Sequence, residues 1–538
     1  MPSIQFKGKT FVQNHHLAVP YHQLIPKKDK SLTESVSLHD NLVIQGDNLL
    51  ALKALLPTYA GKIKCIYIDP PYNTGNEGWA YNDNVNSPLI KEWLKDKTPV
   101  DKEDLTRHDK WLCMMLPRLK LLRELLADDG VILVSIDDIE QARLKLLMDE
   151  VFQEHNFIST LVWKSRQNKD NRSLTGVSND HEYVLAYARD IYVSKLFIGD
   201  ERKVEQYSNP DNDPRGDWVS GNMVGILPES QRPNCHYELV NPDTGVNYGK
   251  PKLGWRYDKN TMSRLINEER ILWPKEPTGR PRRKVFLSEM KDSTTGFSSV
   301  VGKDIYTRHG SADIDEIFGE RKFDFPKPVA FVKSLLQQVT NEDSIVLDSF
   351  SGTGTTAQAV LELNKDDGGN RKFVLVEMED YTDEITAERV RRVIKGIPKS
   401  KNENLKQGLG GTFSYFKLGD PIETEGILDG SKLPSYLELA RYVYYTATGE
   451  EFNESKLNEG TGFIGSSKHH DVYMIYKPDI EYLKQTALTL NKARELRKKA
   501  GSRPLLVFAP TKYVESGELD ELKIDFCQLP FEIYKVGK

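Results

Sequence analysis

The stretch SIVLDSFSGTGTTAQAVLELN, residues 344–364, decides the fold class. Its apolar start predicts a buried β-strand, its end predicts an amphipathic helix, and the glycines between them indicate a tight turn. Gly352, Gly354 and Ala357 form a G-x-G-x-x-A pattern, and Glu377 ends the next predicted strand, FVLVE. Such glycines let backbone amides approach a ligand, and the acid can accept hydrogen bonds from ribose hydroxyls. The pattern predicts a site for an adenosine-containing cofactor, although a tight turn without a ligand has the same spacing.

Three cofactor classes can be weighed against this turn. A Walker phosphate loop is excluded, because Thr355 and Thr356 follow Gly354 where that loop needs a lysine. NAD is compatible with the glycine spacing. S-adenosylmethionine contains adenosine but no pyrophosphate, so it needs less glycine. Asp348, just before the turn, can face the ammonium of its methionine moiety, and Phe350 also suits that cofactor.

A second strand end carries reactive groups in CIYIDPPYNTG, residues 65–75. The exocyclic amine of adenine is a poor nucleophile, because its lone pair is delocalised into the ring. The Asp69 carboxylate and the Pro70 carbonyl can accept the two amine hydrogens and aim the lone pair at an electrophilic methyl group. Pro71 adds rigidity without a competing donor, and Tyr72 offers a ring for stacking a base flipped out of the duplex. The motif alone also fits a proline-rich turn.

The pattern of predicted elements indicates an α/β protein. Residues 41–75 read as strand, helix and strand, the rhythm of a parallel sheet, and similar elements continue to about residue 195. From about 200 to 320, short segments rich in Asn, Asp, Pro and Gly replace this rhythm. The rhythm then resumes, and mixed helix and strand follow from about 425. We therefore expect one sheet that is interrupted by an insertion and then completed.

Composition limits the class of protein. The 538 residues are 38% hydrophobic and 28% charged, which is typical of globular domains, and the net charge of -5 restricts nucleic-acid contact to local basic patches. Four cysteines are scattered singly, which predicts neither a zinc site nor a disulfide framework and fits a reducing cytoplasm. They are Cys65, Cys113, Cys235 and Cys527. No apolar run is long enough to cross a bilayer. We expect a cytoplasmic protein that makes no membrane contact.

The order of the two motifs carries a family resemblance. DPPY at 69–72 and FSGTG at 350–354 resemble the motifs of amino-methylating DNA methyltransferases of the β class. GDNLLAL, NDHEYVLAYA, PRRKVFLSE and FDFPKPVAF add a closer resemblance to the modification subunit of type III restriction-modification systems, over about residues 40–420. This resemblance implies an S-adenosylmethionine-dependent, Rossmann-like sheet in circularly permuted order. The implied parts are an N-terminal extension (1–40), a catalytic half (41–200), a target-recognition region (201–320), a cofactor half (321–420) and a small C-terminal α/β domain (421–538).

The resemblance also implies roles for particular residues. Residues 69–72 become the catalytic loop. The cofactor residues are Asp348, Phe350, Gly352, Gly354, Glu377, Lys327, Pro328 and Asp47. Lys327 can equally be a solvent-facing lysine at a helix start, and Asp47 an ordinary helix cap. His181 and Tyr183 can approach the flipped base, although a strand aromatic in the core explains the tyrosine as well. Candidate DNA contacts are Arg280, Arg282, Arg283 and Lys284, for which an exposed basic turn is the alternative.

The function these features predict is a site-specific DNA methyltransferase. It transfers a methyl group from S-adenosylmethionine to N6 of a flipped adenine, without a metal, as the modification subunit of a type III system. With aspartate rather than serine at position 69, the motif resembles the adenine-modifying members of the family more than the cytosine-modifying ones. Expected partners are double-stranded DNA, a second copy of the chain and a helicase-nuclease restriction subunit. Alternatives are a stand-alone or other phage-defence adenine methyltransferase, an N4-cytosine methyltransferase, an NAD-linked oxidoreductase and a non-catalytic DNA-binding subunit.

Overall fold

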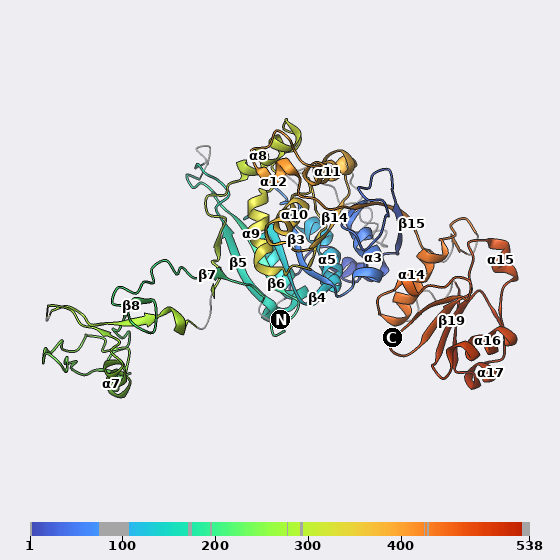
Figure 1. The fold of residues 1–538 in the computed structure, drawn as a ribbon. Helices are drawn as coiled ribbons and strands as arrows, with labels where there is room; N and C mark the ends of the chain where they lie inside the picture. The colour runs from blue at the N-terminus through green and yellow to red at the C-terminus, as the bar shows by residue number, and fades with distance from the viewer. Residues whose placement is uncertain are drawn as a thin grey trace. The chain divides into compact units, whose positions relative to one another are not determined.

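The computed structural model describes residues 3–74, 107–169, 175–193, 196–276, 278–290, 294–423, 426–427 and 430–529. Two compact units emerge: Met1–Ile198 together with Ser298–Lys538, and Gly199–Phe297. Figure 1 shows their elements. The five-part division of the chain remains a proposal. Within the described ranges, no helix has both the length and the apolar composition needed to span a bilayer.

A large mixed sheet dominates the first unit, and ten strands belong to it in the part of the chain that is described. In spatial order they are β1 (His22–Pro26), β15 (Ser414–Pro421), β2 (Leu42–Gln45), β14 (Lys372–Glu377), β13 (Ile345–Asp348), β3 (Ile63–Ile68), β4 (Leu126–Ile136), β6 (Glu182–Ala188), β5 (Phe157–Trp163) and β12 (Val300–Val301). Strands β15 to β4 are parallel, whereas β6 runs antiparallel to β4 and β5. The late strand β13 thus lies beside the early strand β3. This confirms the predicted α/β sheet, interrupted and completed in permuted order.

Hydrophobic side chains and flanking helices explain why these strands are interior. Nearly all residues of β3, β13 and β14 are buried, as expected for parallel strands covered on both faces. Helix α3 (Asn48–Tyr59) packs on α5 (Arg107–Leu125), and α9 (Val329–Val339) packs on α10 (Thr355–Asp367). Other helices of this unit are α1 (Lys9–Val12), α2 (His15–Ala18), α6 (Gln141–Met148), α8 (Thr307–Phe318), α11 (Glu388–Lys395) and α12 (Glu403–Gln407).

The C-terminal segment forms a smaller sheet with helices, as predicted. Its strands are β16 (Phe463–Ser466), β17 (Asp471–Met474), β19 (Leu505–Ala509) and β21 (Ile524–Gln528), with a short β18 (Leu488–Thr489) and β20 (Lys512–Tyr513) pair. Its helices are α14 (Tyr436–Thr448), α15 (Ile480–Gln485), α16 (Leu490–Ala500) and α17 (Ser516–Glu521). Helix α14 contacts α3, and the Tyr442 ring lies 4.5 Å from that of Tyr21. This contact joins the segment to the main core.

The second unit is a small module with little apolar core. It contains β8 (Trp218–Asn222), β10 (Arg282–Phe286) and β9 (Ile271–Leu272) in one sheet, the pair β7 (Asp200–Glu201) and β11 (Thr294–Thr295), and α7 (Lys259–Asn267). Met223, Trp255 and Leu265 are among its buried apolar residues. Because so small a core contributes little hydrophobic stabilisation, polar contacts carry more of the module's stability.

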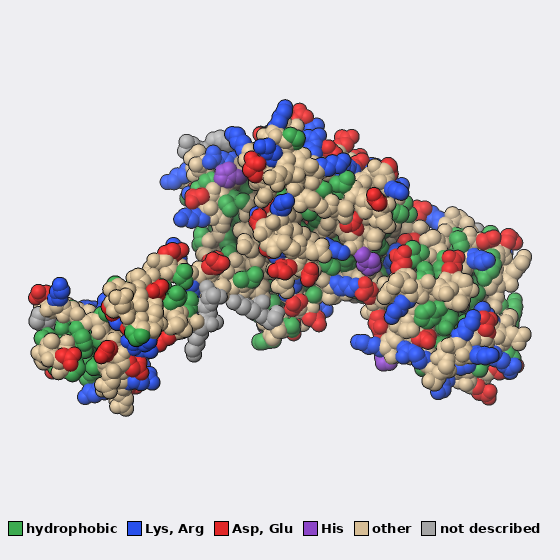
Figure 2. Space-filling model, in the orientation of Figure 1, with side chains coloured by type: hydrophobic (Ala, Val, Ile, Leu, Met, Phe, Trp, Pro, Cys, Tyr) green, Lys and Arg blue, Asp and Glu red, His purple; other side chains and the backbone are tan. Residues whose placement is uncertain are grey.

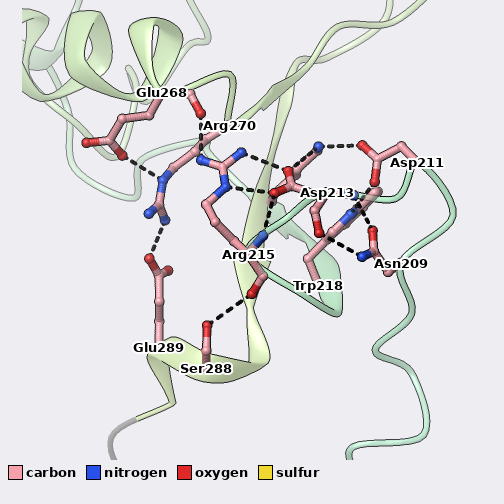
Figure 3. Close-up of polar contacts among 10 residues, drawn as sticks. Asn209, Asp211, Asp213, Arg215, Trp218, Glu268, Arg270, Ser288 and Glu289 are labelled. Atoms are coloured by element: carbon pink, nitrogen blue, oxygen red, sulfur yellow. Dashed lines mark hydrogen bonds and ion pairs between the residues drawn. The ribbon is translucent and has the colours of Figure 1, made fainter.

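An ion-pair network supplies such contacts, as Figure 3 shows. Asp213 accepts hydrogen bonds from Arg215 at 2.8 and 2.7 Å and from Lys284 at 2.7 Å. Hydrogen bonds from Arg215, followed by those from Lys284, hold the pKa of Asp213 well below its usual range. Arg270 pairs with Glu268 at 2.6 Å and with Glu289 at 2.5 Å. The network therefore ties β10 to the segments before β8 and after α7.

Candidate active site

Three carboxylates converge at the carboxyl edge of the large sheet. Asp69 directly follows β3, Asp348 ends β13, and Glu377 ends β14. These strands are neighbours and run parallel, so their ends meet at one edge, the place where α/β sheets bind ligands. All three residues line a cavity of about 470 Å³. Sites predicted from segments far apart in sequence thus open onto one cavity.

Most of the predicted site residues line this cavity. They are Asp69, Pro70, Pro71, Tyr72, Lys327, Asp348, Phe350, Gly352 and Glu377. Asp47, Pro328 and Gly354 are absent from the lining that the described residues form. Each of those three is instead the N-cap of a helix, namely α3, α9 and α10. They set where the helices begin beside the cavity.

The glycine turn adopts a backbone that favours glycine. Gly352 has φ 49° and Gly354 has φ 79°, both left-handed. A Cβ atom at Gly354 would lie 3.3 Å from Thr386, whereas at Gly352 the nearest atom would belong to the Phe323 ring, at an ordinary contact distance of 3.8 Å. The Gly352 amide donates to Glu377 Oε2 at 2.7 Å, so the acid of the next strand holds the turn. Burial raises the pKa of Glu377, and the hydrogen bonds that its carboxylate accepts from backbone amides oppose this rise.

The acid beside the turn is also held in place. Asp348 accepts hydrogen bonds from the Phe350 amide at 3.0 Å and the Thr356 hydroxyl at 2.5 Å. Burial raises the pKa of Asp348 to about 7, although both hydrogen bonds favour the ionised form. The buried hydroxyls of Ser349 and Ser351 line the same cavity and have no hydrogen-bond partner among the described residues. The site therefore presents an acid and unsatisfied polar atoms to a ligand.

Two side-chain hydrogen bonds hold the loop after β3, which contains the DPPY motif. Trp111 Nε1 donates to the Pro71 carbonyl at 2.7 Å. Asn73, which has φ 63°, donates from its side chain to the buried Glu140 at 2.6 Å. A positive φ in a residue other than glycine persists only where surrounding contacts maintain it. These contacts hold Asp69 and Tyr72 at the cavity.

Lys327 contacts the DPPY loop directly. Its Nζ donates to the two carboxylate oxygens of Asp69 at 2.9 and 2.8 Å and to the Tyr72 hydroxyl at 2.7 Å, and it lies 3.4 Å from Glu182. Burial works against the ammonium, but Asp69 and Glu182 outweigh it and raise the pKa of Lys327. Burial raises the pKa of Asp69, and Lys327 opposes that rise. The lysine that sequence reasoning assigned to the cofactor thus lies against the proposed methyl-acceptor site.

Sequence reasoning did not identify Glu182. This residue begins β6, and because β6 is antiparallel to β4, its start lies at the same sheet edge as the end of β3. The flanking pair that was singled out, His181 and Tyr183, instead bond to each other at 2.7 Å, and Tyr183 donates to Asp138 at 2.8 Å. The available signal in the sequence was an acid at the start of a predicted strand. Using that signal would have required knowing in which direction the strand runs in the sheet.

Aromatic and basic residues beside the glycine turn were also missed. Phe323 and Tyr381 both line the cavity, and their ring centroids are 5.5 Å apart. Arg389 is fully buried and donates to the hydroxyls of Thr353 and Thr355 at 2.7 and 2.9 Å. Arg389 thus supports the turn through its hydroxyl side chains, a contact that no local sequence pattern reveals.

The predicted basic cluster of the second unit does not form one exposed surface. Arg280 and Arg282 are exposed, and Arg282 donates to Ser220 at 2.6 Å. Arg283 lies 5.2 Å from the Tyr257 ring centre. Lys284 is buried in ion pairs with Asp211 and Asp213. In the first unit, Figure 2 shows Lys and Arg side chains interspersed with acids. Contact between the basic cluster and DNA remains a prediction.

The chain is similar to known proteins. A family described as DNA methylase matches residues 63–388. The Mod subunit of the type III restriction-modification enzyme StyLTI from Salmonella typhimurium is 31% identical over 454 residues, which cover 78% of this chain and 66% of that protein. The chain thus spans slightly less than two thirds of that relative. The type II methyltransferase M.KpnI from Klebsiella pneumoniae is 32% identical over 360 residues, covering 65% of this chain and 82% of that protein.

The chain belongs to the DNA methylase family. S-adenosylmethionine is the methyl donor that the sequence predicts. The residues present fit this cofactor: Asp348 suits its ammonium group, Glu377 retains acceptor capacity for ribose hydroxyls, and the unpartnered hydroxyls of Ser349 and Ser351 can bond its polar groups. The cavity volume is also in the range of small-molecule sites.

Proposed function

We propose that this chain methylates N6 of adenine at specific sites in double-stranded DNA. The observation that carries this proposal is the single cavity shared by the DPPY loop and the glycine turn. One motif is suited to an exocyclic amine, and the other to an adenosine-containing methyl donor. Asp69, rather than serine, favours adenine, and an N4-cytosine activity is the nearest alternative.

The residues of the catalytic loop act by positioning and electrostatics. S-adenosylmethionine, when bound, supplies a methyl group activated by its sulfonium. Asp69 and the Pro70 carbonyl accept the two amine hydrogens, which directs the nitrogen lone pair away from the ring. The Tyr72 ring stacks on the flipped base. Transfer of the methyl group to the nitrogen would break the bond between that methyl carbon and the sulfonium sulfur, leaving a neutral thioether and a positively charged nitrogen. The hydrogen held by Asp69 would then leave the nitrogen as a proton and pass to solvent.

Cofactor binding is assigned to the other side of the cavity. Asp348 faces the ammonium of the methionine moiety, with Phe350 beside it. Gly352 leaves space for close approach of the backbone, and Glu377 accepts the ribose hydroxyls. Asp47, Pro328 and Gly354 contribute as helix caps at the cavity edge.

We further propose that the chain serves as the modification subunit of a type III system. The resemblance to the StyLTI Mod subunit supports this role. Such a subunit pairs with a second copy and with a helicase-nuclease subunit that cuts unmodified DNA. The second unit, with Arg280 and Arg282 exposed, is the proposed region of target recognition.

One experiment tests the substrate and the base together. The full chain is incubated with mixed genomic DNA and tritiated S-adenosylmethionine, and nucleosides from the product are separated. Label in N6-methyl-2′-deoxyadenosine supports the proposal, and label in N4-methyl-2′-deoxycytidine redirects it to cytosine. Binding of NAD and not of S-adenosylmethionine in a calorimeter would contradict it. Mapping methylated adenines in DNA from expressing cells then gives the recognition sequence.

A further inference from the structure

Glu182 shares the hydrogen-bond donors around the catalytic loop with Asp69. The Tyr72 hydroxyl donates to Glu182 Oε2 at 2.9 Å, and Lys327 Nζ lies 3.4 Å from the same oxygen. The Glu182 side chain is only 18% exposed, so these contacts are largely removed from bulk solvent. Charge-assisted hydrogen bonds in such surroundings are stronger than neutral ones at a surface.

The number of donors explains why a second acceptor matters. An ammonium has three donors and a phenol has one. Lys327 bonds to both Asp69 oxygens and to the Tyr72 oxygen, while the phenol donates to Glu182 at 2.9 Å and also interacts with Asp69. Without the Glu182 carboxylate, the phenol proton would turn to Asp69, where Lys327 already bonds to both oxygens. The target amine would then compete with them for the lone pairs of Asp69.

We propose that Glu182 is a positioning residue of methyl transfer, which takes the Tyr72 proton and part of the Lys327 charge so that Asp69 keeps an open acceptor for the target amine. This inference rests on the proposed function. The contact with Glu182 also helps to fix the orientation of the Tyr72 ring, because the hydroxyl then bonds to both Glu182 and Lys327. Glu182 acts through Asp69 and Tyr72 and does not itself contact the methyl group.

The charges around Asp69 predict a pH signature of this role. The ionisable groups that act on Asp69, from its own loop and from the neighbouring elements, are Lys327, Glu182, Tyr72, Tyr67 and Asp348. Repulsion from the Glu182 carboxylate raises the pKa of Asp69, whereas Lys327 opposes that rise. Removing the Glu182 charge should therefore lower the pKa of Asp69. The acid limb of the pH-rate profile should move to lower pH even though the maximal rate falls.

The test compares Glu182→Gln with the unchanged chain in single-turnover methyl transfer. We expect the maximal rate to fall about 10- to 100-fold, the range for losing a hydrogen bond to a charged group. Affinity for S-adenosylmethionine and the thermal midpoint should stay unchanged, and the acid limb should shift down. Asp138→Asn is the matched control, because Asp138 is also a carboxylate at this sheet edge that accepts from a tyrosine, Tyr183.

A second variant separates positioning from a general loss of structure. In a Tyr72→Phe background no phenol proton is available to occupy Asp69, so Glu182→Gln should cost a smaller factor than in the unchanged chain. An unchanged rate in Glu182→Gln, or equal factors in both backgrounds with an unshifted acid limb, would overturn the inference. Loss of activity in Asp69→Ala alongside those results would leave the proposed function standing, whereas full activity in Asp69→Ala would overturn the proposed function itself.

Discussion

The ammonium of Lys327 lies 2.8 Å from the Asp69 carboxylate, although 258 residues separate them in the sequence. The two residues come from opposite sides of the inserted unit, Gly199–Phe297. Their ion pair forms only when β13 and β14 complete the sheet that β3 begins. Because Lys327 also bonds to Tyr72, completion of the sheet sets the geometry of the DPPY loop.

Replacement of Asp69 by asparagine should separate catalysis from cofactor binding. The amide has a similar size but loses the charge that attracts the amine hydrogens, so we expect methyl transfer to fall at least about 100-fold. Affinity for S-adenosylmethionine, measured by calorimetry, should change little, because Asp69 lies on the substrate side of the cavity. Asp129→Asn is the control, since Asp129 is a carboxylate that pairs with Lys64 in β3, the strand that Asp69 directly follows. Near-normal activity in Asp69→Asn would contradict the assigned role.

Replacement of Lys327 by methionine should destabilise the protein in a pH-dependent way. It leaves Asp69 and Glu182 largely buried without a cation, a change that costs about 3–5 kcal/mol. Burial already raises the folded pKa of Asp69 above its unfolded value, and loss of Lys327 raises it further. Stability from such a group is present at low pH and is lost as pH rises through the folded pKa. The deficit should therefore be smaller at about pH 6 than at about pH 8.

Urea unfolding at both pH values measures this deficit. The matched control is Lys333→Met, which removes another lysine paired with two carboxylates, Glu362 and Asp366, on the exposed side of α9. Its cost should be smaller, because Lys333 is 24% exposed and Lys327 10%. A deficit for Lys327→Met that does not change with pH would refute the explanation through unpaired carboxylates.

Binding of S-adenosylmethionine should tighten as pH rises through about 7. The pKa of Asp348 is raised to about 7 by burial, so its carboxylate is mostly protonated at pH 6 and mostly ionised at pH 8. Only the ionised form attracts the cofactor's positive charge, and we expect roughly a tenfold gain in affinity between those pH values. Titration calorimetry measures the change. Asp348→Asn should bind weakly and lose the Asp348 contribution to this dependence, and an identical pH profile in that variant would count against the assignment.

The sequence predicted what is local to a strand end. The acids Asp69, Asp348 and Glu377 each follow or end a recognisable apolar strand, and parallel strands bring such ends together, so the shared cavity could be anticipated. Glu182 could not be found in this way, because it reaches the same edge only through the antiparallel direction of β6.

The direction of side chains was the second property that could not be predicted from the sequence. Motif position assigned Lys327 to the cofactor, but only the fold reveals that its ammonium reaches Asp69. Likewise, four basic residues close in sequence read as one patch, yet Lys284 is buried, because its ammonium pairs with Asp211 and Asp213 of the segment before β8. Composition and periodicity contain no information on these contacts.

The two glycines of the cofactor turn should differ in their tolerance of alanine. Both have a left-handed backbone, so each substitution costs about 1 kcal/mol from strain alone. At Gly354 the added Cβ would also lie 3.3 Å from Thr386, whereas at Gly352 it would make only an ordinary contact of 3.8 Å with Phe323. We therefore expect Gly354→Ala to lose more unfolding free energy than Gly352→Ala in urea titrations. Gly368→Ala, a left-handed C-cap with no neighbour within 4 Å, is a control for strain alone. Equal losses at Gly352 and Gly354 would show that Thr386 adjusts freely.

Substitutions of two basic residues in the second unit should weaken DNA binding by two different routes. Arg280 is exposed, so Arg280→Ala should reduce affinity similarly for all sequences and lower the slope of log affinity against log salt by about 1, as expected for one lost phosphate contact. Lys284→Met instead removes a buried partner of Asp211 and Asp213, so it should loosen the module and increase its cleavage in limited proteolysis. Ion pairing depresses the pKa of Asp213, so the stability that this carboxylate contributes is lost as pH falls through its folded pKa. Lowering the pH should therefore increase cleavage of the module in the unchanged chain, as Lys284→Met does. An intact module that keeps its salt slope in both variants would exclude this cluster from DNA contact and move target recognition to another face of the same unit.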